Sequence, residues 1–354
     1  MRSVNTTQET LPSTGIIGHA GALALLDRSR EAGRLAHAYI FVGPRHVGKM
    51  ALALYLAKSV NCQGEGRPPC DVCSQCRRIG SGWHVDVQVI DTSSEGESDE
   101  DKTDKTRIGI GKVRELQRQV SLRPYEGVCR VFIVDGAELL THEAANSLLK
   151  SLEEPPEGVL FVLLATDETS VLPTILSRCQ RIELSPMPTD DLAQTLTSRY
   201  AVQEENARLI ARLSGGCTGW AISAAQDDSV LGARIDSLDV LIELADSDLE
   251  GRFQYASKLS QLYSNDKQGV RDLMDLWTLW WRDLILTWAG QGDVATNLHR
   301  NDKLEEQSLR YSLDAIQMFI KRIKEARHYL ERNVNPRTAL EWLMLGFPEA
   351  QTAG

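Results

Sequence analysis

The first half of the chain alternates between short apolar runs and longer amphipathic segments. Between residues about 15 and 186, the apolar runs predict strands at 38–42, 85–90, 130–134, 159–165 and 180–184. The segments between them have apolar residues every three or four positions and predict helices that include 49–60, 107–122 and 143–152. Uninterrupted apolar strands separated by helices are typical of a parallel sheet that is covered on both faces. This part of the chain is therefore expected to have an α/β fold.

The remainder of the chain predicts helices alone. A small part, residues 187–228, is expected to form short helices with a break at the glycine pair 215–216. A larger part, residues 229–354, contains no strand-like run. Its clearest predicted helices lie at 273–289 and 309–330. Four of the seven tryptophans fall between positions 277 and 288, at a helical spacing that favours a core or a subunit interface over a ligand site. The predicted fold class is α/β followed by all-α.

The chain is acidic overall. Its net charge of −10, from 39 basic and 49 acidic residues, argues against a free-standing DNA-binding domain, which is usually basic. Part of the acidity comes from Glu95–Asp104, so residues 92–106 are expected to form a solvated acidic loop. No apolar run approaches the roughly 20 residues that span a bilayer, and residues 1–14 lack the apolar core of a secretory signal. We expect a disordered tail at 1–14, a cytoplasmic location and no membrane partner.

A glycine-rich segment follows the first predicted strand and opens the first predicted helix. It has the sequence Gly43-Pro-Arg-His-Val-Gly-Lys49-Met50 and contains the GxxxxGK pattern of a phosphate-binding P-loop. In such a loop the backbone N–H groups, the helix N-terminus and the lysine ammonium bind phosphate oxygens. The next residue is normally Ser or Thr, whose hydroxyl coordinates Mg²⁺. Met50 carries a thioether, which cannot replace a hard oxygen ligand.

A second element of ATP hydrolysis is altered after the third predicted strand. Asp135, which would support the metal, is retained, but Gly136 stands where ATPases carry a glutamate that polarises the attacking water. Glycine cannot accept a proton, and Glu138, two residues further on, is expected to point elsewhere. These two losses predict a P-loop ATPase fold that no longer hydrolyses ATP. Binding of ATP or ADP remains open, because the residues that would contact phosphate are intact. These residues are Gly43, Gly48 and Lys49.

Four of the seven cysteines lie within fifteen residues of one another. They are Cys62, Cys70, Cys73 and Cys76. In a cytoplasmic chain such a cluster is more often a metal site than a pair of disulfides. Four thiolates at these spacings would complete the closed tetrahedral shell of a structural Zn²⁺ ion, at about 2.3 Å each, and would leave no position for a reactive water. We therefore predict a structural zinc module over 62–76. Reduced cysteines without metal and iron–sulfur ligation are the alternatives.

Several blocks of the sequence together resemble the N-terminal domain of the clamp-loader subunits of bacterial DNA polymerase III. The blocks follow the family's order and cover most of residues 15–186. They lie at 37–49, 61–62, 69–76, 131–156 and 163–179. The segment 333–343 resembles the closing helix of one subunit of the family. The resemblance implies an AAA+ P-loop domain over 15–186, a small helical lid domain over 187–228, and a helical collar domain over 229–354 that joins subunits into a ring of five.

The resemblance also implies a task and partners. Rings of this family open a sliding clamp and place it on primed DNA in chromosomal replication. They combine gamma/tau and delta subunits with this kind of chain in a hetero-pentamer. Any contact with DNA is expected to be to backbone phosphates inside the ring, and so to be sensitive to salt. The expected location is the replisome at the nucleoid, within the cytoplasm.

The family's ATPase elements can be compared with this chain position by position. Members that hydrolyse ATP carry Lys-Thr in the P-loop and Asp-Glu after the strand, whereas this chain has Lys49-Met50 and Asp135-Gly136. This departure implies the subunit of the family that does not hydrolyse ATP. The lid of the ATPase subunits also offers an arginine to the γ-phosphate, and Trp220 stands at the best-matching position here. Thr166 resembles the residue that senses the γ-phosphate within the same chain and is expected to be vestigial.

One further motif implies a role in the active site of a neighbouring subunit. Ser177-Arg178-Cys179 resembles the arginine-finger motif of the family, so Arg178 would reach across an interface to the ATP of the adjacent subunit. A guanidinium aimed at the γ-phosphate stabilises the charge of the transition state. Two alternatives remain open for the whole chain. One is an active ATPase subunit of the gamma/tau type, and the other, outside the family, is a P-loop kinase-like enzyme.

Overall fold

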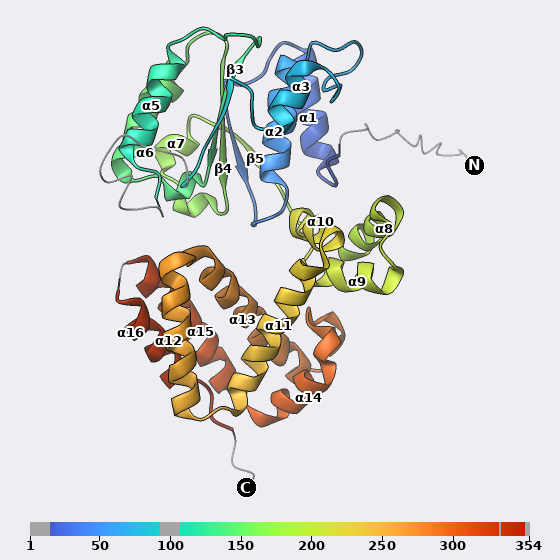
Figure 1. Cartoon of the computed structure of the whole chain (residues 1–354), viewed down its shortest axis with the longest axis vertical. Coiled ribbons are helices and arrows are strands. Elements are labelled where there is room, and N and C mark those ends of the chain that lie inside the picture. The colour runs from blue at the N-terminus through green and yellow to red at the C-terminus, as the bar shows by residue number, and fades with distance from the viewer. Residues whose placement is uncertain (1–14, 93–106, 333, 351–354) are drawn as a thin grey trace, which may run out of the picture. The chain divides into compact units, whose positions relative to one another are not determined.

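A computed structural model describes residues 15–92, 107–332 and 334–350 of the chain (Figure 1). The predicted tail, residues 1–14, lies outside the described residues. The predicted acidic loop does so as well, except for its first residue, Thr92.

The chain divides into two compact units. The first contains Met1–Met187 together with Cys217–Gly219, and the second contains Pro188–Gly216 together with Trp220–Gly354. The first unit holds the segments that predict α/β structure, and the second holds the segments that predict helices alone. The subdivision of the helical part at residue 228 into a lid and a collar stays a prediction.

A five-stranded parallel sheet forms the centre of the first unit. The strands follow the order β2-β3-β4-β1-β5 across the sheet. They are β1 (Ala38–Val42), β2 (Val87–Ile90), β3 (Arg130–Asp135), β4 (Val159–Ala165) and β5 (Gln180–Glu183). Every residue of β1 and of β4 is buried, so both faces of the sheet are covered, as their uninterrupted apolar runs predict. The α/β expectation for this part is confirmed.

Helices cover the two faces of this sheet (Figure 1). Alternate residues of β1, β3 and β4 belong to separate apolar cores on the two faces. One group of helices is α1 (Ala20–Glu31), α2 (Lys49–Asn61) and α3 (Ser74–Gly80). The other group is α5 (Ile110–Val120), α6 (His142–Glu153) and α7 (Pro173–Leu176). Tyr39 and Phe41 of β1 belong to the core that includes α1 and α2, whereas Ile40 and Val42 belong to the core that includes α5 and α6. This division follows from the two-residue repeat of a strand.

The sheet brings three predicted site segments to one edge. In a parallel sheet the carboxyl ends of all strands lie on the same side, which is where ligands bind in open α/β sheets. The P-loop follows β1, Asp135 ends β3, and Thr166 follows β4. Because β4 pairs with both β1 and β3, these three segments are neighbours.

Two predicted boundaries differ from the structure. The strand predicted from residue 85 begins only at Val87, because His84 and Asp86 are buried in polar contacts before it. The single helix predicted over 309–330 is wrong, since one helix ends at Arg310 and the next begins at Leu313. Tyr311 between them is extended, and the Ser312 hydroxyl accepts a hydrogen bond from the Ala315 N–H at 3.2 Å, which starts a new helix.

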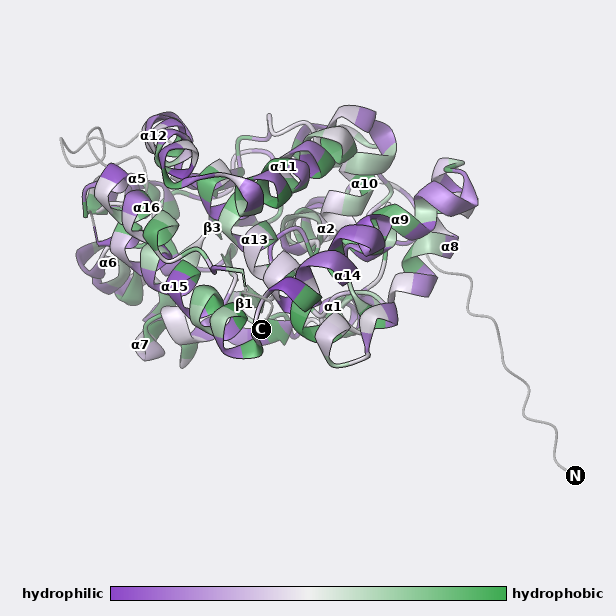
Figure 2. Cartoon of the chain, turned by 90° about the horizontal axis from the view of Figure 1, so that it is seen from below, coloured by the Kyte–Doolittle hydropathy of each residue, from purple (hydrophilic) through white to green (hydrophobic). Residues whose placement is uncertain are grey.

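The described residues of the second unit form helices and no strands. The helices are α8 (Thr189–Tyr200), α9 (Glu204–Leu213), α10 (Thr218–Gln226), α11 (Asp228–Asp246), α12 (Leu249–Asn265), α13 (Lys267–Trp288), α14 (Asn301–Arg310), α15 (Leu313–Glu331) and α16 (Pro336–Leu345). The first two residues of α10 belong to the first unit. Polar and apolar residues share the surfaces of these helices, as Figure 2 shows for α11, α12 and α14. The all-α expectation for this part is confirmed.

The tryptophan stripe forms the core of this second unit. Trp277, Trp280 and Trp281 on α13 are buried. The ring of Trp281 lies 4.9 Å from that of Phe319 and 5.4 Å from that of Phe347, measured between centroids. Aromatic pairs at these distances stabilise a core beyond the area that they bury. The preference for a core over a ligand site is therefore confirmed for these three residues.

Candidate functional site

The P-loop has the backbone that its glycines permit. Gly48 has a φ of 114°, in the region that favours glycine, and immediately precedes α2. A Cβ atom at Gly43 would overlap the Leu184 carbonyl oxygen beside β5, so this position admits only glycine. Met50 stands in the first turn of α2, next to Lys49. The predicted phosphate-binding residues are thus placed together, with a thioether at the position of the missing hydroxyl.

Lys49 is turned toward its own loop. Its Nζ donates hydrogen bonds to the Gly43 carbonyl at 2.6 Å and to the Pro44 carbonyl at 2.8 Å. Burial lowers the pKa of this ammonium, and the negative charges of Glu138 and Asp135 oppose that shift. A phosphate group would have to replace the two carbonyls as partners of the ammonium.

The tip of the P-loop is held by residues that sequence reasoning missed. The Val47 carbonyl accepts hydrogen bonds from His19 Nε2 at 2.7 Å and from Thr218 Oγ1 at 3.1 Å. The His46 carbonyl accepts one from the Gly219 N–H at 2.7 Å. A Cβ atom at Gly219 would lie 2.8 Å from the same oxygen. In the sequence, the glycines after residue 214 indicated a turn, but they did not indicate that this turn contacts the P-loop.

Trp220, at the position expected for the family's lid arginine, is the next residue and belongs to the second unit. There its ring lies under the guanidinium of Arg234, 5.1 Å from the ring centroid. The indole itself carries no positive charge that a γ-phosphate would attract.

The ends of β3 and β4 hold a second group of predicted residues. Asp135 is exposed at the end of β3, and Gly136 follows with a φ of 91°. A Cβ atom on Gly136 would lie 2.9 Å from Leu139 Cδ1. Restoring a glutamate at this position would therefore strain the turn as well as add a side chain.

Glu138, which we expected to point elsewhere, turns back toward the predicted sensor residue. Its Oε1 accepts hydrogen bonds from the Thr166 hydroxyl at 2.6 Å and from the Thr166 N–H at 3.2 Å. Its negative charge also acts on Lys49. The Thr166 hydroxyl thus has a partner within the chain, which could not be predicted from the sequence.

Arg178 lies at the surface of the first unit, just after α7 (Pro173–Leu176). Its Nη1 donates to the Thr174 carbonyl at 2.9 Å and to Ser177 Oγ at 3.1 Å. Its Nη2 forms an ion pair with Glu153. The guanidinium is exposed enough for a second chain to contact it.

The four clustered cysteines converge on one point. Their sulfur atoms all lie within 4.8 Å of one another. Cys62 follows α2, Cys73 is the N-cap of α3, and Cys76 lies in the first turn of α3. A Cβ atom at Gly64 would overlap the Cys70 side chain, so the glycine turn leaves room for the sulfur atoms to approach. Four cysteines in this arrangement could hold a metal ion.

Backbone N–H groups point at these sulfur atoms. Cys62 Sγ accepts from the Cys70 N–H, Cys70 Sγ from the Cys73 N–H, and Cys73 Sγ from the Cys76 N–H, at 3.3–3.4 Å. Burial raises the pKa of the Cys73 thiol, but hydrogen bonds from Cys76 and Gln63 outweigh it and lower that pKa to about 6. Metal ligation requires the thiolate form, which this arrangement favours at Cys73.

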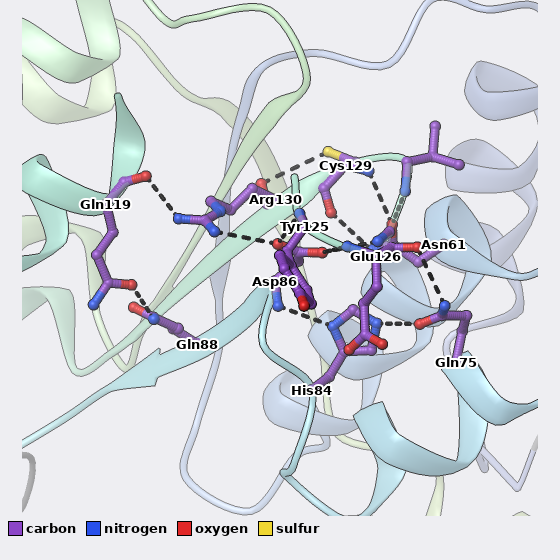
Figure 3. A network of polar contacts seen from close by, with 12 residues as sticks. Asn61, Gln75, His84, Asp86, Gln88, Gln119, Tyr125, Glu126, Cys129 and Arg130 are labelled. Atoms are coloured by element: carbon purple, nitrogen blue, oxygen red, sulfur yellow. Dashed lines mark hydrogen bonds and ion pairs between the residues drawn. The ribbon is translucent and has the colours of Figure 1, made fainter. Parts of the chain in front are cut away.

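A buried polar network joins the cysteine module to the sheet (Figure 3). The Asp86 carboxylate accepts hydrogen bonds from the N–H groups of residues 125–127, each at 2.8 Å, and forms an ion pair with Arg130 at 3.3 Å. Asn61, beside Cys62, accepts from the N–H groups of residues 128 and 129. Gln75 of α3 donates to the Glu126 carbonyl at 3.3 Å. The loop before β3 therefore anchors both ends of the module.

Replacing Asp86 with alanine is expected to lower the free energy of unfolding of the first unit by about 3 kcal/mol, because Arg130 and three N–H groups would lose a buried partner. Burial raises the pKa of Asp86, but the three N–H groups and Arg130 outweigh it and lower that pKa. The contribution is therefore complete above pH about 4 and is lost as pH falls through the folded-state pKa. Urea unfolding at pH 7 and pH 3 measures both effects. The exposed Asp190→Ala variant serves as the control, and an equal loss in it would contradict the prediction.

Comparison with known proteins gives a consistent result. A family model described as "DNA polymerase III, delta subunit" matches residues 18–188. The DNA polymerase III subunit delta' of Bacillus subtilis is 28% identical over 327 residues, which cover 92% of this chain and 95% of that relative. The chain is thus similar to a delta' subunit of DNA polymerase III along most of its length.

Tau and gamma/tau subunits of DNA polymerase III match a shorter part of the chain. DNA polymerase III subunit tau of Escherichia coli is 35% identical over 214 residues, which cover 59% of this chain and 31% of that relative. Among solved structures, a DNA polymerase III gamma subunit-related protein from Thermotoga maritima covers 90% of this chain and 97% of its own, with 17% identity and a TM-score of 0.46. At that TM-score the structural similarity carries no argument about this chain. In the described part of the chain, no helix is both long enough and apolar enough to cross a membrane.

Proposed function

We propose that this chain is a clamp-loader subunit of the delta' type, which does not hydrolyse ATP and acts within a ring that loads a sliding clamp onto primed DNA. The observation that carries the proposal is the near-complete overlap with a delta' relative, 92% of this chain and 95% of the other. The partners would be gamma/tau and delta subunits in a hetero-pentamer, the clamp, and DNA reached through the assembled ring. Beside the lid domain, the collar domain would join this chain to the other subunits of the ring. The ring would act at the replisome.

Three features of the nucleotide site support the loss of hydrolysis. Met50 offers no oxygen to Mg²⁺, and Gly136 offers no base. The φ of Gly136 shows that the turn itself is shaped for glycine. Two of the three N–H donors of Lys49 bond to carbonyls of its own loop. ATP or ADP remains a candidate ligand of Gly43, Gly48 and Lys49, held without turnover.

The chain by itself is expected to show no ATP hydrolysis above background in the presence of Mg²⁺, while the ring assembled with its ATPase subunits, clamp and primed DNA is active. A steady-state phosphate-release assay measures both. The Lys49→Ala variant is the control, because it should not change the background rate of phosphate release by the chain alone. Turnover by the chain alone that disappears in Lys49→Ala would instead establish an active ATPase.

That alternative, an ATPase of the gamma/tau type, is favoured by one observation: identity to tau, at 35%, exceeds identity to delta', at 28%. The tau match, however, covers only 59% of this chain. The relatives described above are DNA polymerase III subunits, and they give the kinase-like alternative no support.

For the cysteine cluster we propose structural Zn²⁺, ligated by Cys62, Cys70, Cys73 and Cys76. Four thiolates form a closed shell, so the ion would stabilise the module and take no part in a reaction. The clustering of the sulfur atoms and the N–H groups aimed at them support this choice.

For Arg178 we propose the role of an arginine finger that acts on the ATP of a neighbouring subunit. Support comes from its partly exposed position after α7 and from the family motif around it. Such a group stabilises the charge that develops on the transferred phosphoryl group, and it needs no nucleotide in its own chain.

A further inference from the structure

The Arg178 guanidinium is held by contacts on two sides. Nη1 bonds to the Thr174 carbonyl and to Ser177 Oγ, both within the turn that follows α7. Nη2 faces a different element, because its ion-pair partner Glu153 is the last residue of α6 (His142–Glu153). The first contacts set the direction of the side chain, and the second supplies a neutralising charge.

The position of Glu153 is fixed by the end of α6. Glu154 is the C-cap, with a φ of −125° and a ψ of 69°, and Pro155 and Pro156 follow it. Proline disfavours the helical conformation in the preceding residue, so α6 must stop here. The Glu-Glu-Pro-Pro segment therefore presents the Glu153 carboxylate at a defined place, beside the turn that carries Arg178.

The ion pair between Arg178 and Glu153 is weak enough to be displaced by a stronger partner. The side chains of Arg178 and Glu153 are 32% and 48% exposed. Ion pairs exposed to this degree shift an equilibrium by no more than about fivefold. A phosphate group offers the guanidinium two or more oxygens and a larger charge, so it would displace a single carboxylate.

We propose that Glu153 is a positioning residue for Arg178, and that it holds the guanidinium in a charge-neutralised resting position until the phosphate of a neighbouring subunit displaces it. This inference rests on the arginine-finger role proposed above. The Arg178–Glu153 pair would then regulate hydrolysis, because Glu153 competes with the phosphate for Arg178. This competition would lower ATP hydrolysis in the ring until the clamp and DNA favour the state in which Arg178 contacts the phosphate.

The test is the Glu153→Gln variant in the assembled ring, with and without clamp and primed DNA. Glutamine keeps the size and one oxygen acceptor but removes the charge. The quantity to follow is the Arg178-dependent rate, taken as the ATPase rate of the ring minus that of the Arg178→Ala ring. We expect this rate to rise about two- to fivefold without clamp and DNA, and to change less with them. The neighbouring exposed carboxylate offers a matched control, since Glu154→Gln should change neither rate.

The double variant Glu153→Gln/Arg178→Ala separates a competing charge from a structural role. If Glu153 acts through Arg178, the double variant hydrolyses ATP at the rate of Arg178→Ala alone. A rise that persists in the double variant overturns the inference. So does an unchanged or lower rate in Glu153→Gln while Arg178→Ala still depresses the ring, and the finger role then stands. If Arg178→Ala has no effect, the finger role fails and the inference fails with it.

Discussion

In an assembled ring that carries Arg178→Ala, ATP hydrolysis at the site facing this chain is expected to fall about 10³-fold. Removal of an arginine finger costs 10³–10⁵ in rate in related phosphoryl-transfer enzymes. Other ATP sites in the ring keep their own fingers, so the whole-ring rate should fall by the share of the affected site. A single-turnover experiment resolves this share, because it counts the bound ATP that no longer reacts after clamp and primed DNA are added.

Folding and assembly should survive the same substitution. The contacts that Arg178 makes, with Thr174, Ser177 and Glu153, lie at the surface, and exposed ion pairs contribute about 1 kcal/mol or less. Arg181 is a matched control, since it is also exposed and pairs with Glu168 and Glu183. Arg181→Ala should leave the stimulated rate unchanged. A stimulated rate that is equally high in Arg178→Ala rings would show that Arg178 is not a finger.

The fold could be predicted from the sequence where local pattern decides structure. The run at 159–165 is apolar at every position, and a strand with both faces buried leaves that mark. The P-loop could be predicted because its glycines are set by backbone geometry within a few residues. The prediction failed at Tyr311 and Ser312, where a serine cap interrupts an otherwise continuous apolar repeat. The repeat on both sides has the same period, so periodicity alone could not show the break.

The contacts that shape the site could not be predicted, because they join residues far apart in the chain. Asp86 looks like an ordinary strand residue, but its partners lie about forty residues away, in the loop before β3. The sequence predicts no contact for Glu138, but the ends of β3 and β4 place it beside Thr166. In each case a polar side chain is buried only after the sheet has formed, and its partner depends on that topology.

Gly136 shows what the structure adds to a residue already singled out. The sequence shows only that glycine stands where the family resemblance implies a glutamate base. The φ of 91° and the nearby Leu139 side chain show that the turn now requires glycine. The proposed loss of hydrolysis therefore has a counterpart in the backbone, because a glutamate at position 136 would strain this turn.

The second large effect is expected at the cysteine module. Cys73→Ser should lower bound zinc from about one ion per chain to a small fraction, and it should loosen residues 62–80. Cys73 serves twice: its sulfur is one of the four converging sulfur atoms, and it accepts the Cys76 N–H as the N-cap of α3. Binding of a structural Zn²⁺ contributes about 10–16 kcal/mol in small zinc modules, far more than the few apolar residues of this segment. Loss of one ligand should therefore unfold the module locally.

The rest of the first unit should remain folded, because the sheet has its own apolar cores on both faces. Metal analysis after dialysis and limited proteolysis with mass spectrometry measure the two expectations separately. Cys129→Ser is the matched control, since this cysteine lies beside the network but outside the cluster. Wild-type chain without zinc, or with iron in its place, would contradict the zinc assignment. Zinc retained in Cys73→Ser would show that Cys73 is not a ligand, and cleavage throughout the sheet would show that the module supports the whole unit.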